Sequence, residues 1–401
     1  MSKNHNVPQV RFKGFTDTWE QRKFKNVFDF LQNNALSRAD LSNEEGTVLN
    51  VHYGDILVKF GEVIDIEKDE LPSIVDESIV KKYTSSLLQN GDVIIADAAE
   101  DETVGKCSEI KGLSDKKVLA GLHTIPVRPK EKYACGYLGY YMNSGSYHNQ
   151  LLPLMQGTKV SSISKSAIQD TDILYPKSEA EQQQIGTYFR NLDNLISLHQ
   201  RKCDSLQKMK KAMLQKMFPK NGESVPDIRF KGFTDAWEQR EFDEVFTSFA
   251  NKNYQVQSTE YHESGKYPII DQGKKTIIGY CDNKDKVCNK YPSVIFGDHT
   301  TEIKYVDFPF VIGADGVKTL SVKDGDTLFQ YYNLQVNNVQ PTGYNRHFSM
   351  LKEISLNVPT LAEQKEIGTY FHNLDNLISL HQRKLETLKK LKKSMLQKMF
   401  V

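Results

Sequence analysis

A block that spans 38 positions occurs twice and constrains the fold more than any other feature. It reads EQQQIGTYFRNLDNLISLHQRKCDSLQKMKKAMLQKMF from Glu181 to Phe218 and EQKEIGTYFHNLDNLISLHQRKLETLKKLKKSMLQKMF from Glu363 to Phe400. Apolar residues alternate in steps of four and three, the heptad pattern of a helix that packs against another helix. No proline interrupts either copy, and the lysine-rich last turns suit a helix C-terminus. At about 1.5 Å per residue, each copy predicts a rod of roughly 55 Å.

The apolar seam predicts that the two helices pack against each other. Its positions are Ile185, Phe189, Leu192, Ile196, His199, Cys203, Leu206, Met213 and Met217 in the first copy, and Ile367, Phe371, Leu374, Ile378, His381, Leu385, Leu388, Met395 and Met399 in the second. Burial at ~1.5–3 kcal/mol per large side chain favours a paired rod over two separately tethered helices. Lys210 and Lys392 also lie on the seam. We interpret the seam histidines as packed and hydrogen-bonded rather than as ligands.

A second duplication precedes each stretch of unlike sequence. RFKGFTDTWEQRKF covers Arg11–Phe24, and RFKGFTDAWEQREF covers Arg229–Phe242. Two such similar copies suggest that something outside the fold reads both. The eight residues PKNGESVP after Phe218 reach at most ~30 Å, so the second unlike segment starts at the far end of the first helix. The second helix must then run antiparallel to the first, and each helix end must approach one repeated box.

The chain is therefore predicted as two α/β globular domains joined by two long antiparallel helices that form a pseudo-twofold symmetric coiled coil. Strand-like runs such as GDVIIAD and SVIFGDH alternate with polar loops in the unlike segments. The predicted boundaries are residues 1–24 for the first box, 25–180 for the first globular domain, 181–218 for the first helix, 219–242 for the linker and second box, 243–362 for the second globular domain, and 363–401 for the second helix.

Bulk composition sets wide limits. With 52 Lys and Arg against 51 Asp and Glu, the formal charge is +1, whereas a protein that binds nucleic acid unaided usually has a basic excess. No apolar run approaches the ~20 residues of a membrane span, and the opening residues MSKNHNVPQV lack the apolar core of a signal peptide, so we expect a cytoplasmic protein. The five cysteines form no CxxC pair, which argues against a zinc site or a disulfide framework.

Polar residues off the seam also match between the helices. Two copies of one surface imply two copies of one partner, whereas two unlike globular domains imply two unlike targets. A recent duplication that has not drifted is the alternative, although it does not explain why the globular domains have diverged so much further. The predicted partner-docking residues are Asn191, Asp193, Asn194, Arg201, Asn373, Asp375, Asn376 and Arg383.

The order of these elements resembles that of the specificity subunits of type I restriction–modification systems, over essentially the whole chain. The box RFKGFTDTWEQ, the stretch GDVIIADAAEDETVGK (Gly91–Lys106) and the junction P…EQ…IG at Pro176 and Pro359 are similar to that family's. The resemblance implies that each globular domain, a target-recognition domain, reads one half of a bipartite, asymmetric double-stranded DNA site. The helical pair would set the unread spacer and dock two modification subunits, which methylate adenine with S-adenosylmethionine. Restriction (translocase) subunits would join them to form an ATP- and Mg²⁺-dependent nuclease.

Within the recognition domains, we expect bases to be read by polar side chains on exposed loops. One such loop precedes the end of each domain: QGTKVSSISKS (Gln156–Ser166) in the first and PTGYNRHFSM (Pro341–Met350) in the second. The predicted DNA contacts are Lys159, Ser161, Ser162, Asn345, Arg346 and His347, with Lys274, Lys275, His299, Thr300 and Thr301 as further candidates. A solvated turn is the alternative for each of them. Arg346 is the strongest candidate, because an Arg fork on guanine is the commonest specific contact.

Two other functions have some support in the sequence. Asp298, Glu302 and Lys304, with Asp282 or Asp285, loosely imitate a metal-dependent nuclease site, but the first domain has no counterpart of this group. The acidic run Asp97–Glu102 is interpreted as a solvated loop or a contact with a basic partner. The chain has no (N/D)PP(Y/F) run and no GxxxxGK[ST] loop, so we expect a non-catalytic subunit without cofactor or metal of its own. A coiled-coil scaffold that binds two protein partners without DNA is the remaining alternative.

Overall fold

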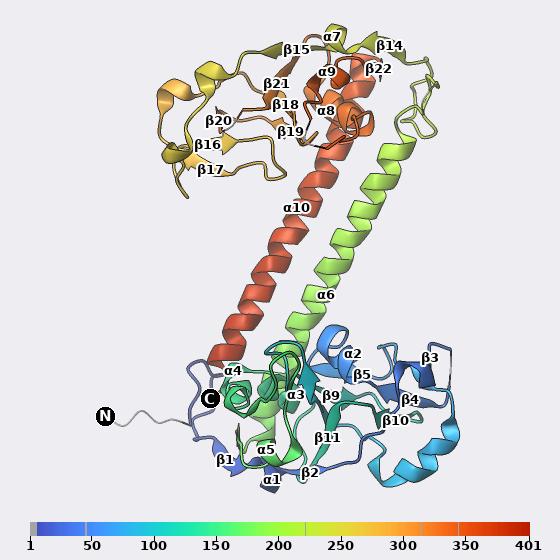
Figure 1. Cartoon of the computed structure of the whole chain (residues 1–401), viewed down its shortest axis with the longest axis vertical. Coiled ribbons are helices and arrows are strands. Elements are labelled where there is room, and N and C mark those ends of the chain that lie inside the picture. Colours follow the sequence, from blue (N-terminus) through green and yellow to red (C-terminus); the bar gives the residue numbers. More distant parts are fainter. Residues whose placement is uncertain (1–5, 45, 221, 314, 344) are drawn as a thin grey trace. The chain divides into compact units, whose positions relative to one another are not determined.

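The computed structural model describes residues 6–44, 46–220, 222–313, 315–343 and 345–401. Positions 1–5, 45, 221, 314 and 344, each inside a predicted segment, lie outside the described residues. The chain divides into two compact units, residues 1–198 with 384–401 and residues 199–383. We call them unit 1 and unit 2 and describe each by itself (Figure 1).

The two repeated blocks form helices α6 (Glu179–Lys216) and α10 (Leu361–Lys398), which begin and end two to three residues before the predicted limits. In unit 1 the Lys392 ammonium lies 2.6 Å from the Asp193 carboxylate. In unit 2 Lys210 pairs with Asp375 at 2.6 Å, and His199 meets His381. In both units, residues with higher numbers on α6 lie beside residues with lower numbers on α10, so the predicted antiparallel pairing is confirmed.

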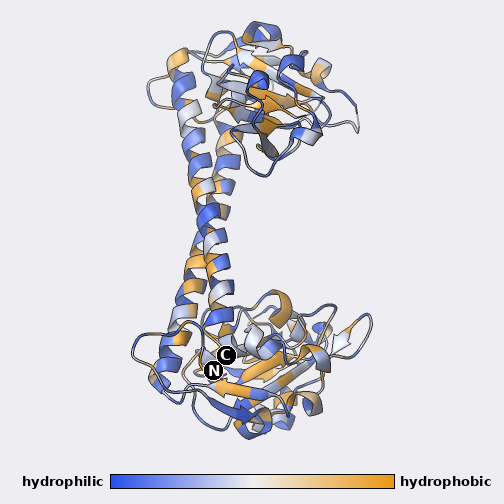
Figure 2. Cartoon of the chain, turned by 90° about the vertical axis from the view of Figure 1, so that its left-hand side faces the viewer, coloured by the Kyte–Doolittle hydropathy of each residue, from blue (hydrophilic) through white to orange (hydrophobic). Residues whose placement is uncertain are grey.

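The predicted seam is confirmed by burial. Phe189 and Phe371 are fully buried, and Cys203 and Leu385 are nearly so. Hydrophilic and hydrophobic residues alternate along both helices (Figure 2). The seam histidines are packed and hydrogen-bonded as predicted, with the two Nδ1 atoms 2.8 Å apart. Among the described residues, no helix combines the length and apolar character needed to cross a bilayer.

Unit 1 is built on a five-stranded sheet in the order β2-β11-β7-β9-β5. The strands are β2 (Phe28–Phe30), β11 (Thr124–Pro129), β7 (Val93–Ala96), β9 (Cys107–Lys111) and β5 (Val63–Asp65). All four residues of β7 are buried, because Val93 and Ile95 face a cluster with helix α3 (Tyr137–Met142) while Ile94 and Ala96 face a second cluster. The run VIIA is thus continuous rather than alternating, as in a strand covered on both faces.

The second cluster of unit 1 is closed by a smaller sheet of order β10-β4-β6-β3. Its strands are β10 (Lys117–Ala120), β4 (Val48–Val51), β6 (Ser73–Ile74) and β3 (Leu41–Ser42), and β4 pairs with β10 in parallel. Helix α2 (Tyr53–Val58) follows β4 directly. The remaining helices are short: α1 (Phe24–Val27), α4 (Gly145–His148) and α5 (Lys165–Ile168).

Unit 2 repeats this plan with a different sequence. Its main sheet has the order β15-β21-β18-β19, and its smaller sheet β17-β16-β20 again contains a parallel pair, β16 with β20. The strands are β15 (Phe246–Phe249), β21 (Val317–Val322), β18 (Ser293–Gly297), β19 (Ile303–Val306), β17 (Gly279–Cys281), β16 (Tyr267–Ile270) and β20 (Val311–Ile312). The helices are α7 (Phe242–Val245), α8 (Thr327–Val336) and α9 (Phe348–Leu351). The prediction of two α/β domains with substantial sheets is therefore confirmed.

The repeated box is part of the joint between each domain and its helix. Its strand β1 (Glu20–Lys23) pairs with β13 (Asp172–Tyr175), and β14 (Glu238–Glu241) pairs with β22 (Ser355–Val358). Arg11 clamps Glu181 through two hydrogen bonds of 2.6 and 2.8 Å, and Arg229 clamps Glu363 through bonds of 2.6 and 2.7 Å. Both glutamates are buried, and a buried carboxylate needs such a partner. The repeated box thus has a role within the fold itself, and recognition of the two copies by something outside the fold stays a prediction.

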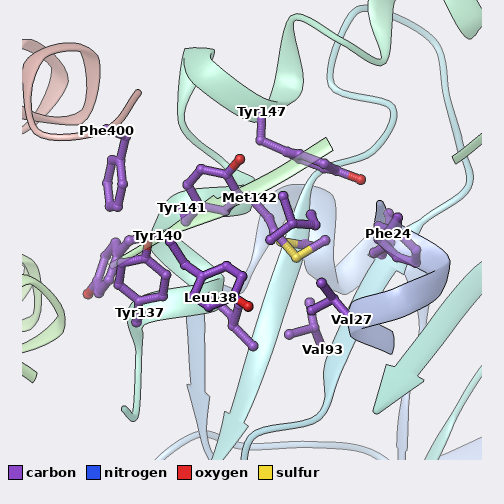
Figure 3. Packing of buried hydrophobic residues seen from close by; sticks show 14 of the residues in the cluster. Phe24, Val27, Val93, Tyr137, Leu138, Tyr140, Tyr141, Met142, Tyr147 and Phe400 are labelled. Atoms are coloured by element: carbon purple, nitrogen blue, oxygen red, sulfur yellow. The ribbon is translucent and has the colours of Figure 1, made fainter. Parts of the chain in front are cut away.

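An aromatic side chain at the end of the opposite helix completes each joint. Phe400 packs against Tyr141 of α3 (Figure 3). It also packs against Trp19 of the box and Phe189 of α6. In unit 2, Phe218 takes the same place against Trp237 and Phe371. The prediction that each helix ends beside a repeated box is confirmed.

Candidate nucleic-acid interface

In unit 2 the ends of several strands and one long loop meet at a single place. The segments are 271–275 after β16, 298–302 after β18, 313–316 after β20 and 341–347 before α9, and we call their described residues the unit 2 loop cluster. Three backbone hydrogen bonds tie them together: Gly313 N to Ile270 O at 2.9 Å, Asp298 N to Gly316 O at 2.7 Å, and His347 N to Asp298 O at 2.8 Å.

Side chains strengthen the unit 2 loop cluster. The Gln272 carbonyl accepts from the Thr300 hydroxyl, and its side-chain oxygen accepts from the His299 amide at 3.1 Å. The His299 Nδ1 atom lies 3.1 Å from the Asn345 carbonyl oxygen. The buried Lys304 ammonium donates to the carbonyls of Asp271 and Lys275 at 2.7 and 2.6 Å. Three separate predicted segments are thus brought to one surface.

On this surface the exposed predicted residues are Lys274, Lys275, Thr300, Asn345 and Arg346, with His299 half-buried. Their donors and acceptors suit phosphate or base contacts. Loops that hold polar side chains on a rigid sheet are the usual place for recognition.

Two predicted contacts are corrected. His347 is fully buried, and its ring nitrogens lie 3.0 Å from the Asp298 carbonyl oxygen and 2.9 Å from the Thr342 amide. Thr301 is also buried, and its φ of 57° places it in the left-handed region. Neither side chain can reach a ligand, because both are used to shape the loops. The sequence could not distinguish them from their exposed neighbours.

Unit 1 has the same construction. Its segments are 52–54 after β4, 97–99 after β7, 121–123 after β10 and 156–162 before α5, and we call them the unit 1 loop cluster. The three equivalent backbone hydrogen bonds are present: Gly121 N to Val51 O at 2.8 Å, Asp97 N to His123 O at 3.1 Å, and Ile163 N to Asp97 O at 2.9 Å. The same scaffold therefore presents two unlike sets of side chains.

The predicted loop of unit 1 is a tight hairpin. Gln156 and Ser162 exchange backbone hydrogen bonds of 3.0 and 2.8 Å, and Gly157 turns the chain at a φ of 114°. Strand β12 (Ser161–Ser162) pairs with β8 (Ala98–Ala99), next to Asp97. Lys159 and Ser162 are exposed and Ser161 is half-buried, so all three lie at the unit 1 loop cluster.

Sequence reasoning missed two residues here, Asp97 and His123, whose side chains meet at 3.2 Å. His123 follows no motif, and Asp97 was interpreted only as part of an acidic run. Burial raises the pKa of Asp97 above its ordinary value, although His123 opposes this shift. Among the described residues, His123 and Thr301 are the non-glycine residues with positive φ, one in each cluster. Backbone strain of this kind concentrates at functional sites.

The group that imitates a nuclease site does not assemble. Asp298 is buried and accepts from the Phe348 amide at 2.9 Å, while Lys304 is directed at Asp271. Asp282 accepts from the Lys266 amide at 3.0 Å, away from this group. The residues that the structure describes contain no set of three His, Cys, Asp or Glu side chains placed to hold a metal ion.

The predicted docking residues on the helices separate into two sets. Asp193 accepts from Tyr140 at 2.6 Å and pairs with Lys392, and Asp375 accepts from Tyr332 at 2.8 Å and pairs with Lys210. These two half-buried aspartates make contacts within their units, and their docking role stays a prediction. Exposed predicted residues are Asn191, Asn194, Arg201, Asn373, Asn376 and Arg383. Beside them, Leu195 and Leu198 on α6 and their counterparts Leu377 and Leu380 on α10 are more than 40% exposed.

Comparison with known proteins gives matches over nearly the whole chain. The family model described as type I restriction modification DNA specificity domain matches residues 16–208 and again residues 234–390. A Methanocaldococcus jannaschii protein named as the MjaX specificity subunit of a type I restriction enzyme is 22% identical over 421 residues, covering 98% of this chain and 95% of that protein. The EcoR124I/EcoR124II specificity subunit of Escherichia coli is 35% identical over 81 residues, 20% of each chain. The crystal structure of the S subunit of a type I restriction–modification system from M. genitalium has a TM-score of 0.68 at 14% identity, covering 98% of this chain and 99% of that one.

Proposed function

Because the chain belongs to the family of type I restriction–modification DNA specificity subunits, we propose that its two loop clusters each read one half of a bipartite DNA site. The observation that carries this proposal is the pair of equivalent scaffolds with unlike side chains. Three backbone hydrogen bonds recur at matching places in both clusters. Unit 2 presents Lys274, His299 and Arg346, whereas unit 1 presents Lys159, Ser161 and Ser162. Different side chains on one frame favour an asymmetric site.

The helical pair is the element that we propose sets the unread spacer between the half-sites. Helices α6 and α10 each contain 38 residues. At about 1.5 Å per residue, each is about 57 Å long. Their seams bury large apolar side chains together with lysine–carboxylate pairs, which favours a stiff element over a flexible linker.

We further propose that the exposed faces of the two helices dock two methyltransferase subunits. The face around Leu195 and Leu198, flanked by Asn191 and Asn194, recurs on α10 around Leu377. An apolar centre with a polar rim is the usual composition of a protein interface. In this proposal the methyltransferase subunits use S-adenosylmethionine, and the complex with restriction subunits uses ATP and Mg²⁺. The small formal charge of this chain then agrees with phosphate contacts shared among subunits.

The proposal is tested by competition gel shifts of the chain with its methyltransferase partner. A specificity subunit selects one set of duplexes from a random pool, whereas a scaffold without DNA binding shows no preferred duplex. Arg346→Ala should then relax discrimination at one half-site by about 1–3 kcal/mol. The control is Arg240→Ala, which removes the same charge from strand β14 of unit 2. A uniform loss of affinity for all sequences would instead make Arg346 a phosphate contact.

A further inference from the structure

The unit 1 loop cluster contains two side chains in contact, Asp97 and His123, that are not among the predicted DNA contacts. In unit 2, three segments of the loop cluster contain predicted DNA contacts. In unit 1, the predicted contacts all lie in the hairpin 156–162. The matching hydrogen bonds make the ends of β7 and β10 in unit 1 the counterparts of the ends of β18 and β20. The residues at these places, Asp97 and His123, therefore lie where a recognition surface is expected.

Their geometry is specific. His123 Nδ1 lies 3.2 Å from Asp97 Oδ1, with the His123 side chain 52% exposed and that of Asp97 26% exposed. The Tyr53 ring packs edge-on against His123, at 5.2 Å between ring centroids and 74° between planes. The Tyr53 amide donates to the Leu122 carbonyl at 3.4 Å, which links the loop after β4 to this group. The pair is fixed in place and still open to the outside.

The chemistry of the pair favours one kind of ligand. A carboxylate only accepts hydrogen bonds, so His123 Nδ1 carries the proton between them. In neutral imidazole the other ring nitrogen, Nε2, is then an acceptor. A surface of acceptors with a negative charge repels phosphate, whereas it suits an exocyclic amino group. In the major groove these groups are N6 of adenine and N4 of cytosine.

The backbone gives independent support. His123 has a φ of 54°, a conformation that is uncommon for residues other than glycine, although asparagine, aspartate and histidine adopt it more often than the rest. Its carbonyl is held by the Asp97 amide at 3.1 Å, so the chain maintains this conformation through the same residue that its ring contacts. A residue that only links the two loops would not need an exposed imidazole at this position.

We propose that Asp97 and His123 form a base-reading pair of unit 1 that accepts the exocyclic amino group of an adenine or a cytosine, with Tyr53 orienting the imidazole. This inference rests on the proposed function, because it assigns residues to one of its two half-sites. Ser162, which pairs with Ala98 next to Asp97, would contact the neighbouring base or phosphate.

The test measures base preference at every position of the recognised site, using the chain with its methyltransferase partner. Asp97→Asn keeps the side-chain shape but replaces one acceptor oxygen with a donor amide. His123→Asn keeps a residue type that tolerates positive φ while it removes the imidazole. Each variant should lower discrimination at the same one or two base pairs of one half-site, by roughly 5- to 100-fold, and leave the other half-site unchanged.

The matched control is Asp170→Asn, which removes an exposed carboxylate of unit 1 that pairs with Lys25. It should leave every base preference unchanged. An unaltered site in His123→Asn would overturn the proposal, whether or not the melting temperature falls. The same holds if Asp97→Asn weakens binding to all sequences equally. If the wild-type chain itself selects no sequence, the proposed function fails instead, so the two failures are distinguishable.

Discussion

At the scale of single residues, a buried carboxylate of unit 1 satisfies amide groups at the start of a helix. Glu109 of β9 is buried, and its carboxylate accepts from the amides of Gly136 and Gly139 at 2.6 and 3.0 Å. These amides belong to the N-cap and first turn of α3, whose donors have no partner inside the helix. One distant carboxylate therefore caps the helix that covers the main sheet of unit 1.

The cap makes stability depend on pH. Burial raises the pKa of Glu109 to about 7, against the opposing effect of the two amide bonds. Between its ordinary pKa and pH 7 the unfolded chain loses this proton before the folded chain does, so folding stability falls as pH rises through this window. At about 1.4 kcal/mol per pH unit the loss is at most roughly 3 kcal/mol.

Glu109→Gln removes this titration. Thermal unfolding midpoints of the wild type and the variant, compared at pH 5 and pH 7, should show a difference between the two proteins that changes with pH. A constant difference would contradict the assigned pKa.

At the scale of elements, a lysine on the seam of each long helix pairs with an aspartate of the other helix. Lys392 lies 2.7 Å from Glu62 and 2.6 Å from Asp193, whereas among the described residues Lys210 forms an ion pair with Asp375 alone. Burial alone would lower the pKa of Lys392, but its two carboxylate neighbours hold it above the usual value. The ammonium is therefore charged, and its removal leaves carboxylates without their cation.

Lys392→Met should be the more damaging of two matched substitutions. It leaves two partly buried carboxylates uncompensated, at a cost on the order of 2–3 kcal/mol, while Lys210→Met leaves one. Unfolding midpoints of the two variants measure the difference. Equal unfolding midpoints would show that the additional contact of Lys392 with Glu62 does not contribute to stability.

The helices could be predicted from sequence because the heptad pattern and the lysine-rich ends are local signals. Their antiparallel order followed from the short linker after Phe218. The loop clusters could be predicted only in part, because the parallel pairing of β16 with β20 places the loop that contains Lys274, and no local pattern reveals this pairing. Asp193 looked like a surface residue because the covering Tyr140 comes from 53 positions earlier in the chain.

At the scale of the whole molecule, the proposed function has the loop clusters read the DNA and the helices set the spacing between the half-sites. The two functions should therefore separate under mutation. Four residues inserted into both α6 and α10 add about 6 Å of helix, which corresponds to one or two base pairs at about 3.4 Å each. The half-site sequences should stay the same, since no loop residue changes.

The most direct measurement is methylome sequencing of a strain that expresses this chain and its methyltransferase partner, first as wild type and then with the lengthened helices. We predict one bipartite site with unlike halves for the wild type, and the same halves separated by one or two more base pairs for the variant. A palindromic or continuous site, or an unchanged spacer in a folded variant, would contradict the account.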